Sequence, residues 1–280
     1  MTPEVVCVGL ATWDTVLLVP RLPEADGRVV ASERVEAGGG PAATAAVAVA
    51  RLGVPAAFAG RVGDDEAGAR VREALGREGV DVSELEVVPG GVTPRSTILV
   101  EEPTGRRAIV HHEGTVLPLA LGERAAARCR AAAWTHVDHA GWGAAPEGAR
   151  ISVDGGNPIP DLDLARVALY APTESALREA FGSPQAALEA GAGLVVVTRG
   201  EGGSAAYGAG GVSVEAPPHA VEPLVSTLGA GDVFHGALLA ALVQDAPLAD
   251  ALAFANRCAA LSCRALDGRS AIPTPQEVHA

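Results

Sequence analysis

Aromatic side chains are rare in this sequence and make up 3% of its 280 residues. Proteins that hold single-stranded nucleic acid commonly stack its bases on aromatic rings. Basic residues are also outnumbered by acidic ones, and the formal net charge is −13 at pH 7. A chain this acidic repels phosphate backbones and anionic lipid surfaces. We therefore expect neither nucleic acid nor a membrane among its partners.

Disulfide, zinc and export patterns are missing too. No pair of cysteines has C-x-x-C spacing, and no nearby histidine completes a zinc pattern. The first residues lack the basic stretch and apolar core of a secretory signal, and apolar runs such as 42–50 are too short for a membrane span. These absences predict a cytoplasmic protein with reduced thiols. The cysteines are Cys7, Cys129, Cys258 and Cys263.

Patterns of buried strands alternate with patterns of helices along the chain. Hydrophobic residues make up 48% of the sequence, which is enough for the core of one large domain over residues 1–280. The alternation predicts an α/β fold with a mostly parallel sheet and helices on its faces. The expected strands are 5–10, 134–137, 149–154 and 193–198, and the expected helices are 41–52, 65–76, 122–133, 174–181 and 184–190.

Two segments interrupt this alternation. Residues 28–37 alternate polar and apolar side chains in places, and residues 96–112 have the pattern of two strands around a Pro-Thr-Gly turn. Antiparallel ribbons within an α/β chain predict a small accessory sheet. We expect it to use strands from residues 12–37 and 95–113 and to cover a ligand site as a lid.

Residues 226–241, STLGAGDVFHGALLAA, hold the most informative pattern. Glycines let the backbone approach a ligand closely, and free N–H groups at a helix start attract anions. Asp232 stands at that start, directly after Gly229, Ala230 and Gly231. Its carboxylate can take a proton from an attacking hydroxyl while the amides stabilise phosphoryl charge. A lone Gly-x-Gly-Asp is more often a helix cap, so other motifs must decide between these readings.

Further motifs stand before and after this stretch. They are Val8-Gly9 with Asp14, GGGPAATAAVAVARLG at 38–53 followed by GRVGDDEAG at 60–68, TRGEGG at 198–203, and GRSAIP at 268–273. With STLGAGDVFHGALL they span nearly the whole chain. In this order the motifs resemble those of the ribokinase-like (PfkB) carbohydrate kinases, and several are especially similar to sulfofructose kinases.

The resemblance implies a ribokinase-like α/β domain with a β-lid, ATP as donor and Mg²⁺ as cofactor. It implies that Asp232 is the catalytic base and that amides of Gly229, Ala230 and Gly231 stabilise charge. Arg28, His111 and His139 are further candidates for the sugar pocket, and we expect a homodimer through the lid. The remaining implied roles are Asp14, Gly38 and Gly39 for the sugar, Thr198, Gly200, Gly203, Asn256 and Gly268 for the nucleotide, and Glu174 for the metal.

Four positions depart from the family pattern. Ala43 is assigned to the place of a sugar-binding Asn, as in the sulfofructose kinases. Ser226 replaces an Asp that often binds a monovalent cation, which predicts little activation by K⁺. Thr173 and Ala176 replace both defining residues of an N-x-x-E motif, which leaves Glu174 as the candidate for organising Mg²⁺.

The predicted activity is transfer of the γ-phosphoryl group of ATP to a primary hydroxyl of a sugar, with a ketose or sulfofructose-like acceptor. A nucleoside or ribose kinase is an alternative within the same family. A sugar-binding regulator without catalysis is an alternative from another class, motivated by Thr173 and Ala176. A dinucleotide oxidoreductase is disfavoured because no G-x-G-x-x-G follows the first strand.

Overall fold

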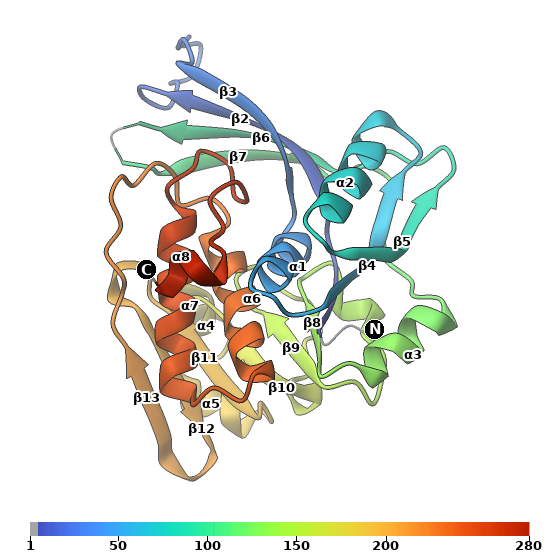
Figure 1. Ribbon diagram of the computed structural model, residues 1–280, viewed down its shortest axis with the longest axis vertical. Coiled ribbons are helices and arrows are strands. Elements are labelled where there is room, and N and C mark those ends of the chain that lie inside the picture. Colours follow the sequence, from blue (N-terminus) through green and yellow to red (C-terminus); the bar gives the residue numbers. More distant parts are fainter. Residues whose placement is uncertain (1–4, 103, 280) are drawn as a thin grey trace.

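Nine strands form one large sheet in the computed structural model, which describes residues 5–102 and 104–279. They are β1 (Val5–Val8), β4 (Ala56–Gly63), β5 (Asp81–Val88), β8 (Trp134–Val137), β9 (Ile151–Asp154), β10 (Val167–Ala171), β11 (Leu194–Thr198), β12 (Ser204–Gly208) and β13 (Val212–Ala216). Their order is β13-β12-β11-β10-β9-β8-β1-β4-β5 (Figure 1). Pairing is parallel except between β11, β12 and β13. The expected mostly parallel sheet is confirmed.

Helices cover both faces of this sheet (Figure 1). One layer comprises α1 (Pro41–Arg51), α2 (Glu66–Arg77), α6 (Ala230–Val243), α7 (Leu248–Ser262) and α8 (Pro275–His279), and the other comprises α3 (Glu123–Ala131), α4 (Glu174–Ala180) and α5 (Pro184–Glu189). Alternate residues of β1 serve the two cores: Val5 and Cys7 pack into the first, and Val6 and Val8 into the second. Such alternation is what a strand buried on both faces requires.

Small residues bring the two site-bearing helices together. Ala45 and Ala48 of α1 face Gly236 of α6, where an added β-carbon would lie 2.5 Å from the carbonyl oxygen of Ala45. Side chains this short allow the helix axes to approach closely, and α1 and α6 form one of the larger helix contacts in the fold. The Ala-rich sequence of α1 therefore fixes its N-terminus beside the N-terminus of α6.

A second, four-stranded sheet stands apart from the large one (Figure 1). It consists of β2 (Thr12–Val19), β3 (Glu33–Gly39), β6 (Arg95–Glu101) and β7 (Arg107–His112), in the order β3-β2-β6-β7. Val16, Ile98 and Val100 form its small apolar core with Leu266 from the C-terminal region. Of the expected Pro-Thr-Gly turn between β6 and β7, Pro103 lies outside the described residues. The accessory sheet predicted from the sequence is present.

Several strands of the large sheet were not predicted from the sequence. β4 (AAFAGRVG) is rich in Ala and Gly, β5 is half exposed at the sheet edge, and β10 directly follows a short 3₁₀ turn at Leu164–Arg166. Each becomes a strand because a buried neighbour offers unpaired backbone groups, which local propensity does not reveal. Among the described residues, no helix is both long and apolar enough to cross a bilayer.

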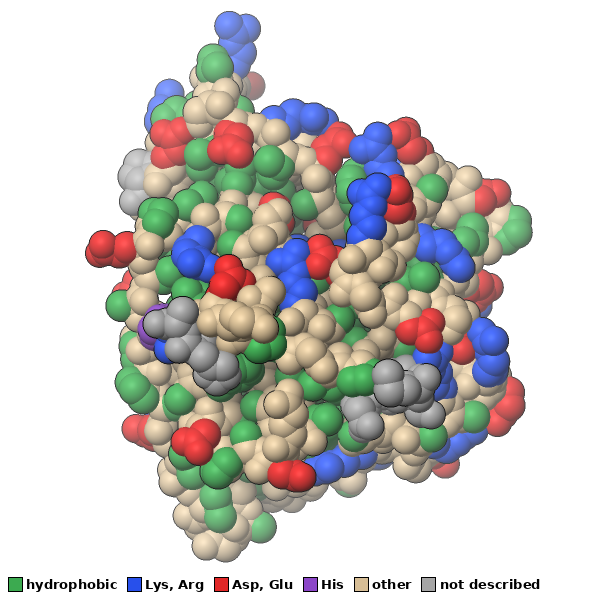
Figure 2. Space-filling view, viewed as in Figure 1, with side chains coloured by type: hydrophobic (Ala, Val, Ile, Leu, Met, Phe, Trp, Pro, Cys, Tyr) green, Lys and Arg blue, Asp and Glu red, His purple; other side chains and the backbone are tan. Residues whose placement is uncertain are grey.

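Charge is distributed evenly over the face shown in Figure 2, where acidic and basic side chains are interspersed. Many of them pair between neighbouring elements. Arg70 of α2, for example, contacts Glu36 of β3 at 2.8 Å and Glu66 at 2.6 Å. Exposed pairs of this kind contribute little to stability, but here they link the accessory sheet to the main body.

Candidate functional site

The N-terminus of α6 carries Asp232 in its first turn. Gly229 precedes the helix in a left-handed conformation (φ 76°), which glycine adopts without strain. The first N–H groups of a helix lack intrahelical acceptors. That of Ala230 makes only a long bond of 3.4 Å to the carbonyl oxygen of Thr227. An added β-carbon at Gly231 would meet open space. The helix start thus faces space that a ligand can enter.

Gly229 and Gly268 need to be glycines because their backbones touch. An added β-carbon on Gly229 would lie 2.9 Å from the Cα and O atoms of Gly268. The C-terminal GRSAIP segment is therefore pressed against the start of α6, although about forty residues separate the two motifs in the sequence. Gly268 forms one wall of the pocket in front of Asp232.

A pocket joins the α6 terminus to the accessory sheet. It brings together Asp14 of β2, the glycine-rich end of β3 and Asp232. An added β-carbon at Gly39 would collide with the carboxylate of Asp14, so this glycine is required where it stands. The pocket is lined by Asp14, Val16, Ala37, Gly38, Gly39, Gly40, Thr44, Leu228, Gly229, Asp232, Asp267 and Gly268.

The Asp14 carboxylate is buried and held on both oxygens. Its Oδ1 accepts a hydrogen bond from the Ser96 amide at 2.9 Å, and its Oδ2 accepts one from the Thr12 hydroxyl at 2.9 Å. Burial nevertheless raises the pKa of Asp14 above its usual value. His111 supports this arrangement from the exposed side, because its Nδ1 lies 3.1 Å from the Ser96 hydroxyl. Asp14 is thus oriented toward the pocket by contacts across three strands.

Buried ionisable groups lie behind Asp232. His235 of α6 and Asp154 at the end of β9 form an ion pair at 3.4 Å. Burial opposes both charges, but the pairing prevails, lowering the pKa of Asp154 to about 2 and raising that of His235. Burial and the nearby Asp154 carboxylate raise the pKa of Asp232 itself to about 7, although His235 and Arg107 act in the opposite direction.

Asp138 is another buried carboxylate that the motif comparison did not single out. It follows β8 and accepts hydrogen bonds from the backbone amides of Leu10 (2.8 Å), Ala42 (3.1 Å), Ala140 (2.9 Å) and Gly141 (2.9 Å). It thereby joins the end of β1 to the first turn of α1. Acids directly after buried strands were the available signal, because the carboxyl ends of parallel strands meet at one edge.

The predicted nucleotide loop is a tight turn between β11 and β12. Gly200 (φ 56°) and Gly203 (φ 77°) both adopt left-handed conformations, and the Arg199 amide donates to the carbonyl oxygen of Gly203 at 2.8 Å. The Thr198 amide donates to Pro172 at 3.1 Å, which ties the loop to the segment before α4. The side-chain amide nitrogen of Asn256, in α7, donates hydrogen bonds to the carbonyl oxygens of Ala216 (3.2 Å) and Pro217 (2.9 Å). These bonds hold the end of β13 in place.

Glu174 begins α4 beside this loop, because Thr173 bridges to Thr198. Its carboxylate is more than half exposed and makes only long contacts with Arg178 (3.6 Å) and Arg199 (3.9 Å). It is therefore free to turn toward a cation. In residues 5–102 and 104–279, no group of three or more metal-ligating side chains gathers. A Mg²⁺ ion that ATP phosphates carry needs only one or two protein carboxylates, and the exposed Glu174 carboxylate is available for such a role.

Some candidates lie outside the pocket lining. Arg28 is exposed in the loop between β2 and β3, and His139 is half-buried after β8 with its Nδ1 unpaired within the described chain. Ala43 is fully buried in α1, whereas its neighbour Thr44 lines the pocket. The residue that faces the pocket is therefore one position after the residue that the sequence assigned to this place. Ser226 is buried, and its hydroxyl accepts the Leu228 amide at 3.2 Å.

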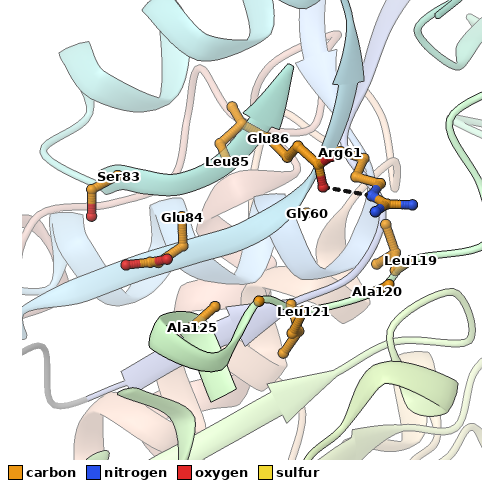
Figure 3. Close-up of a pocket in the computed structure, with 11 residues that line it drawn as sticks. Gly60, Arg61, Ser83, Glu84, Leu85, Glu86, Leu119, Ala120, Leu121 and Ala125 are labelled. Atoms are coloured by element: carbon orange, nitrogen blue, oxygen red, sulfur yellow. Dashed lines mark hydrogen bonds and ion pairs between the residues drawn. The ribbon is translucent and has the colours of Figure 1, made fainter. Parts of the chain in front are cut away.

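Another hollow lies on the opposite part of the sheet, between β4, β5 and α3 (Figure 3). Its polar groups are engaged with one another. Arg61 contacts Glu86 at 2.7 Å and the carbonyl oxygen of Pro118 at 3.0 Å, and Glu84 contacts Arg124 at 3.0 Å. The Ser83 hydroxyl accepts from a neighbouring arginine. No convergent set of free polar groups remains in the described lining, so the pocket at Asp232 is the better site.

Comparisons with known proteins agree with this geometry. The chain is 33% identical to an ATP-dependent ribose-1-phosphate kinase of Halopiger xanaduensis, covering 99% of this chain and 97% of the relative. It is 28% identical to a ribokinase of Bacillus subtilis, covering 98% and 97%. The solved structure of Arabidopsis thaliana ribokinase with ribose and ATP matches with a TM-score of 0.86 at 25% identity, covering 100% and 98%.

A family model agrees as well. The pfkB family of carbohydrate kinases matches residues 2–149 and 161–275. These ranges include the glycine-rich end of β3 and the start of α6, which line the pocket, and the turn between β11 and β12. The chain belongs to the pfkB family of carbohydrate kinases and is an ATP-dependent sugar kinase.

Proposed function

We propose that the chain transfers the γ-phosphoryl group of ATP to a primary hydroxyl of a small sugar bound between Asp14 and Asp232. The observation that carries this proposal is the shared pocket, which joins a buried, oriented carboxylate on the accessory sheet to the carboxylate at the start of α6. One carboxylate can accept hydrogen bonds from sugar hydroxyls. The other can accept a proton.

In this mechanism Asp232 removes the proton from the attacking hydroxyl as its oxygen forms a bond to the γ-phosphorus. The bond between that phosphorus and the bridging oxygen breaks, and ADP leaves. N–H groups of Gly229, Ala230 and Gly231 stand where the negative charge is transferred, and the helix dipole adds to their effect. Mg²⁺, when bound, neutralises charge on the phosphates. We assign Glu174 to holding it.

The nucleotide is assigned to the edge of the sheet formed by Thr198, Gly200 and Gly203. Both glycines have positive φ angles, and an added β-carbon on Gly203 would lie 2.3 Å from the carbonyl oxygen of Ala216, so the tight turn depends on glycine there. Asn256 acts here by positioning the end of β13, since its amide nitrogen is bonded to that backbone. Gly268 borders both the pocket and the start of α6. In this assignment Asp232 acts between the nucleotide and the sugar.

For the acceptor, we propose a ketose or a sulfofructose-like sugar, with ribose and nucleosides as the alternative. A sugar phosphate is a second candidate, because the 33% identical relative is a ribose-1-phosphate kinase. Gly38 and Gly39 are assigned to the wall that contacts the acceptor, beside Asp14. His111 acts through Ser96. Arg28 and His139 are not among the residues that line the pocket, and we assign Arg28 to the acceptor only when the small sheet closes over it.

The experiment is an acceptor panel with the purified chain, Mg²⁺ and ATP. It contains fructose, sulfofructose, ribose, a nucleoside and ribose 1-phosphate, and ADP formation is measured for each. Phosphorus NMR then identifies the carbon that carries the new phosphate. We expect one acceptor class to give a kcat/KM far above the rest, with the product at a primary carbon. Binding of sugar without acceptor-dependent ADP formation would instead favour the non-catalytic regulator.

We also propose a cytoplasmic homodimer joined through the small sheet. Large apolar side chains are exposed there, namely Val30 (78%), Val110 (72%) and Ile109 (49%). A second copy of this sheet would bury them. Sedimentation velocity tests the dimer, and Val110→Glu should shift the population to the monomer. A monomer at every concentration up to that of the assay would contradict it.

A further inference from the structure

The chain passes four times between the large sheet and the small one within residues 5–102 and 104–279. These crossings run from β1 to β2, from β3 to α1, from β5 to β6 and from β7 to α3 (Figure 1). Asp14 and the glycine-rich end of β3 belong to the small sheet, whereas Asp232 belongs to the main body. The shape of the pocket between them therefore depends on how the crossings are held.

Asp138 holds the first two crossings with one carboxylate oxygen. Its Oδ2 accepts the amide of Leu10, before β2, at 2.8 Å and the amide of Ala42, after β3, at 3.1 Å. Its Oδ1 accepts the amides of Ala140 and Gly141, both at 2.9 Å, which ties the carboxylate to the segment after β8. Asp138 is 1% exposed. All four partners are backbone N–H groups, which can only donate, so both of its oxygens must be acceptors.

The two crossings at Asp138 also pack closely together. An added β-carbon at Gly40 would lie 2.2 Å from the carbonyl oxygen of Leu10, and one at Gly9 would lie 2.2 Å from Oδ1 of Asp138. Leu10 stands four residues before Asp14. A shift of the held amide would therefore reach the proposed sugar-binding carboxylate through a short length of strand.

Asp65 holds the other two crossings. It belongs to the GRVGDDEAG motif, which the proposed reaction does not use, and it caps α2 by accepting the Gly68 amide at 2.8 Å. Its Oδ2 accepts the amide of Thr93, before β6, at 3.1 Å, and its Oδ1 accepts the Thr93 hydroxyl at 2.6 Å. The crossing after β7 is fastened to this one, because Val92 and Thr115 exchange two hydrogen bonds of 2.9 Å.

We propose that Asp138 and Asp65 are positioning residues that fix the base of the small sheet on the main body and thereby hold Asp14 at its place in the pocket. Neither carboxylate is among the described residues that line the pocket, so both act through the backbone that they hold. The effect on the acceptor rests on the proposed sugar-kinase function. A misplacement of about 1 Å in a reacting complex can lower the rate roughly 100-fold.

Spin-label distances test whether the two carboxylates set the position of the small sheet. β3 has 7 residues, and at about 3.3 Å per residue a rotation of about 10° at its base moves its far end by roughly 4 Å. Labels are attached at Glu33→Cys, at that far end, and at Asp250→Cys on α7, because both positions are exposed and the native cysteines are buried. Dilution with unlabelled chain removes distances between copies. We expect one narrow distance in the wild type and a broad or shifted distribution in Asp138→Asn and Asp65→Asn.

Asparagine is the informative substitution because it has nearly the same shape but only one oxygen. In either orientation its NH₂ group faces N–H donors, so hydrogen bonds to the crossings or to their anchor are lost. Glu84→Gln is the matched control. Its side chain is 8% exposed and pairs with Arg124 at 3.0 Å, away from the crossings, so it lowers stability and should leave the distance narrow. A control that broadens the distribution equally would show a general loss of stability and would overturn the proposal.

Kinetics test whether the held position matters to the acceptor. In both aspartate variants, kcat/KM for the best acceptor of the panel should fall by roughly 10- to 100-fold. The KM for ATP should stay within about twofold, because the assigned nucleotide turn lies on the large sheet. Full kcat/KM for the acceptor despite a broad distance distribution would overturn the role in placing Asp14. If the wild type has no acceptor-dependent turnover, the sugar-kinase proposal fails, and the distances still decide whether the carboxylates hold the sheet.

Hydrogen exchange in the wild type, followed by NMR, covers the case in which a variant does not fold. The amides of Leu10, Ala42 and Thr93 should exchange as slowly as amides within β1, because each donates to one of the two carboxylates. Exchange as fast as that of the exposed loop residue His219 would show that these bonds do not persist, and the proposal would be wrong.

Discussion

His235 and Asp154 form a buried ion pair at 3.4 Å between α6 and the end of β9. His235 stands one helical turn after Asp232, so the pair lies directly behind the proposed base. The ring of His136 lies 5.5 Å from that of His235, and burial lowers the pKa of His136 to about 3, which leaves it neutral. The pair therefore acts on the proposed base in two directions, because Asp154 raises the pKa of Asp232 and His235 opposes that rise.

Asp232→Asn should abolish turnover while ATP and sugar still bind. The amide has nearly the same shape but cannot accept the hydroxyl proton, so general-base assistance of about 100-fold or more is lost. Initial rates and calorimetric binding of both ligands test this. Asp250→Asn, an acid in the first turn of α7, is the matched control and should behave as wild type. A variant with most of the wild-type rate would remove Asp232 from the mechanism.

The rate should fall as the pH decreases through about 7. Asp232 acts as a base only when ionised, and its pKa is raised to about 7 by burial and by Asp154. With an ordinary aspartate as the base, this fall in rate would be centred at about pH 4. Profiles of kcat from pH 5.5 to pH 9 test the position of the limb.

His235→Asn should move that limb to still higher pH, because it removes the positive charge that opposes the rise in the pKa of Asp232. His219→Asn, at an exposed loop histidine, should leave the profile unchanged. An unshifted profile in the His235 variant would mean that the buried pair does not act on the base. Circular dichroism at each pH separates loss of activity from loss of fold.

Asp14→Ala should weaken sugar binding far more than ATP binding. Removing this carboxylate leaves sugar hydroxyls without acceptors in a buried pocket, at a cost of about 1–3 kcal/mol. Separate KM values for the acceptor and ATP measure the difference. Asp64→Ala, at an exposed acid near the accessory sheet, is the control. Equal losses for both ligands would contradict the sugar role of Asp14.

Potassium should change the rate by less than about twofold, since a monovalent cation needs several oxygen ligands and a compensating charge. The buried Ser226 hydroxyl provides neither, because it is neutral and accepts the Leu228 amide. The assay replaces K⁺ with a bulky organic cation at fixed ionic strength and constant Mg²⁺. A several-fold loss of rate without K⁺ would show that carbonyl oxygens are enough to hold the ion.

Local sequence predicted the helix α6, which carries the proposed base, and the glycines that precede it. Gly229 adopts a positive φ, which is a property of its own backbone. Gly39 must be glycine because an added β-carbon would collide with Asp14, which is a single contact between paired strands. Alternating strand and helix patterns likewise predicted the mostly parallel sheet and the accessory sheet, because each pattern reflects one element's own buried face. The strand limits were less accurate, and β4, β5, β10, β12 and β13 were not anticipated at all.

Only the tertiary structure decided which side chains share the pocket. Thr44 and Arg269 are 225 residues apart and meet because α1 packs on α6 and the C-terminal segment packs on Gly229. Asp154 meets His235 in the same way, through packing of a helix over strand ends. Arg28 was placed near the sugar by its motif, yet its loop leads to the exposed end of the small sheet. Local propensity is set by neighbours in the chain, whereas the polarity of a pocket is set by groups that only folding brings within hydrogen-bond distance.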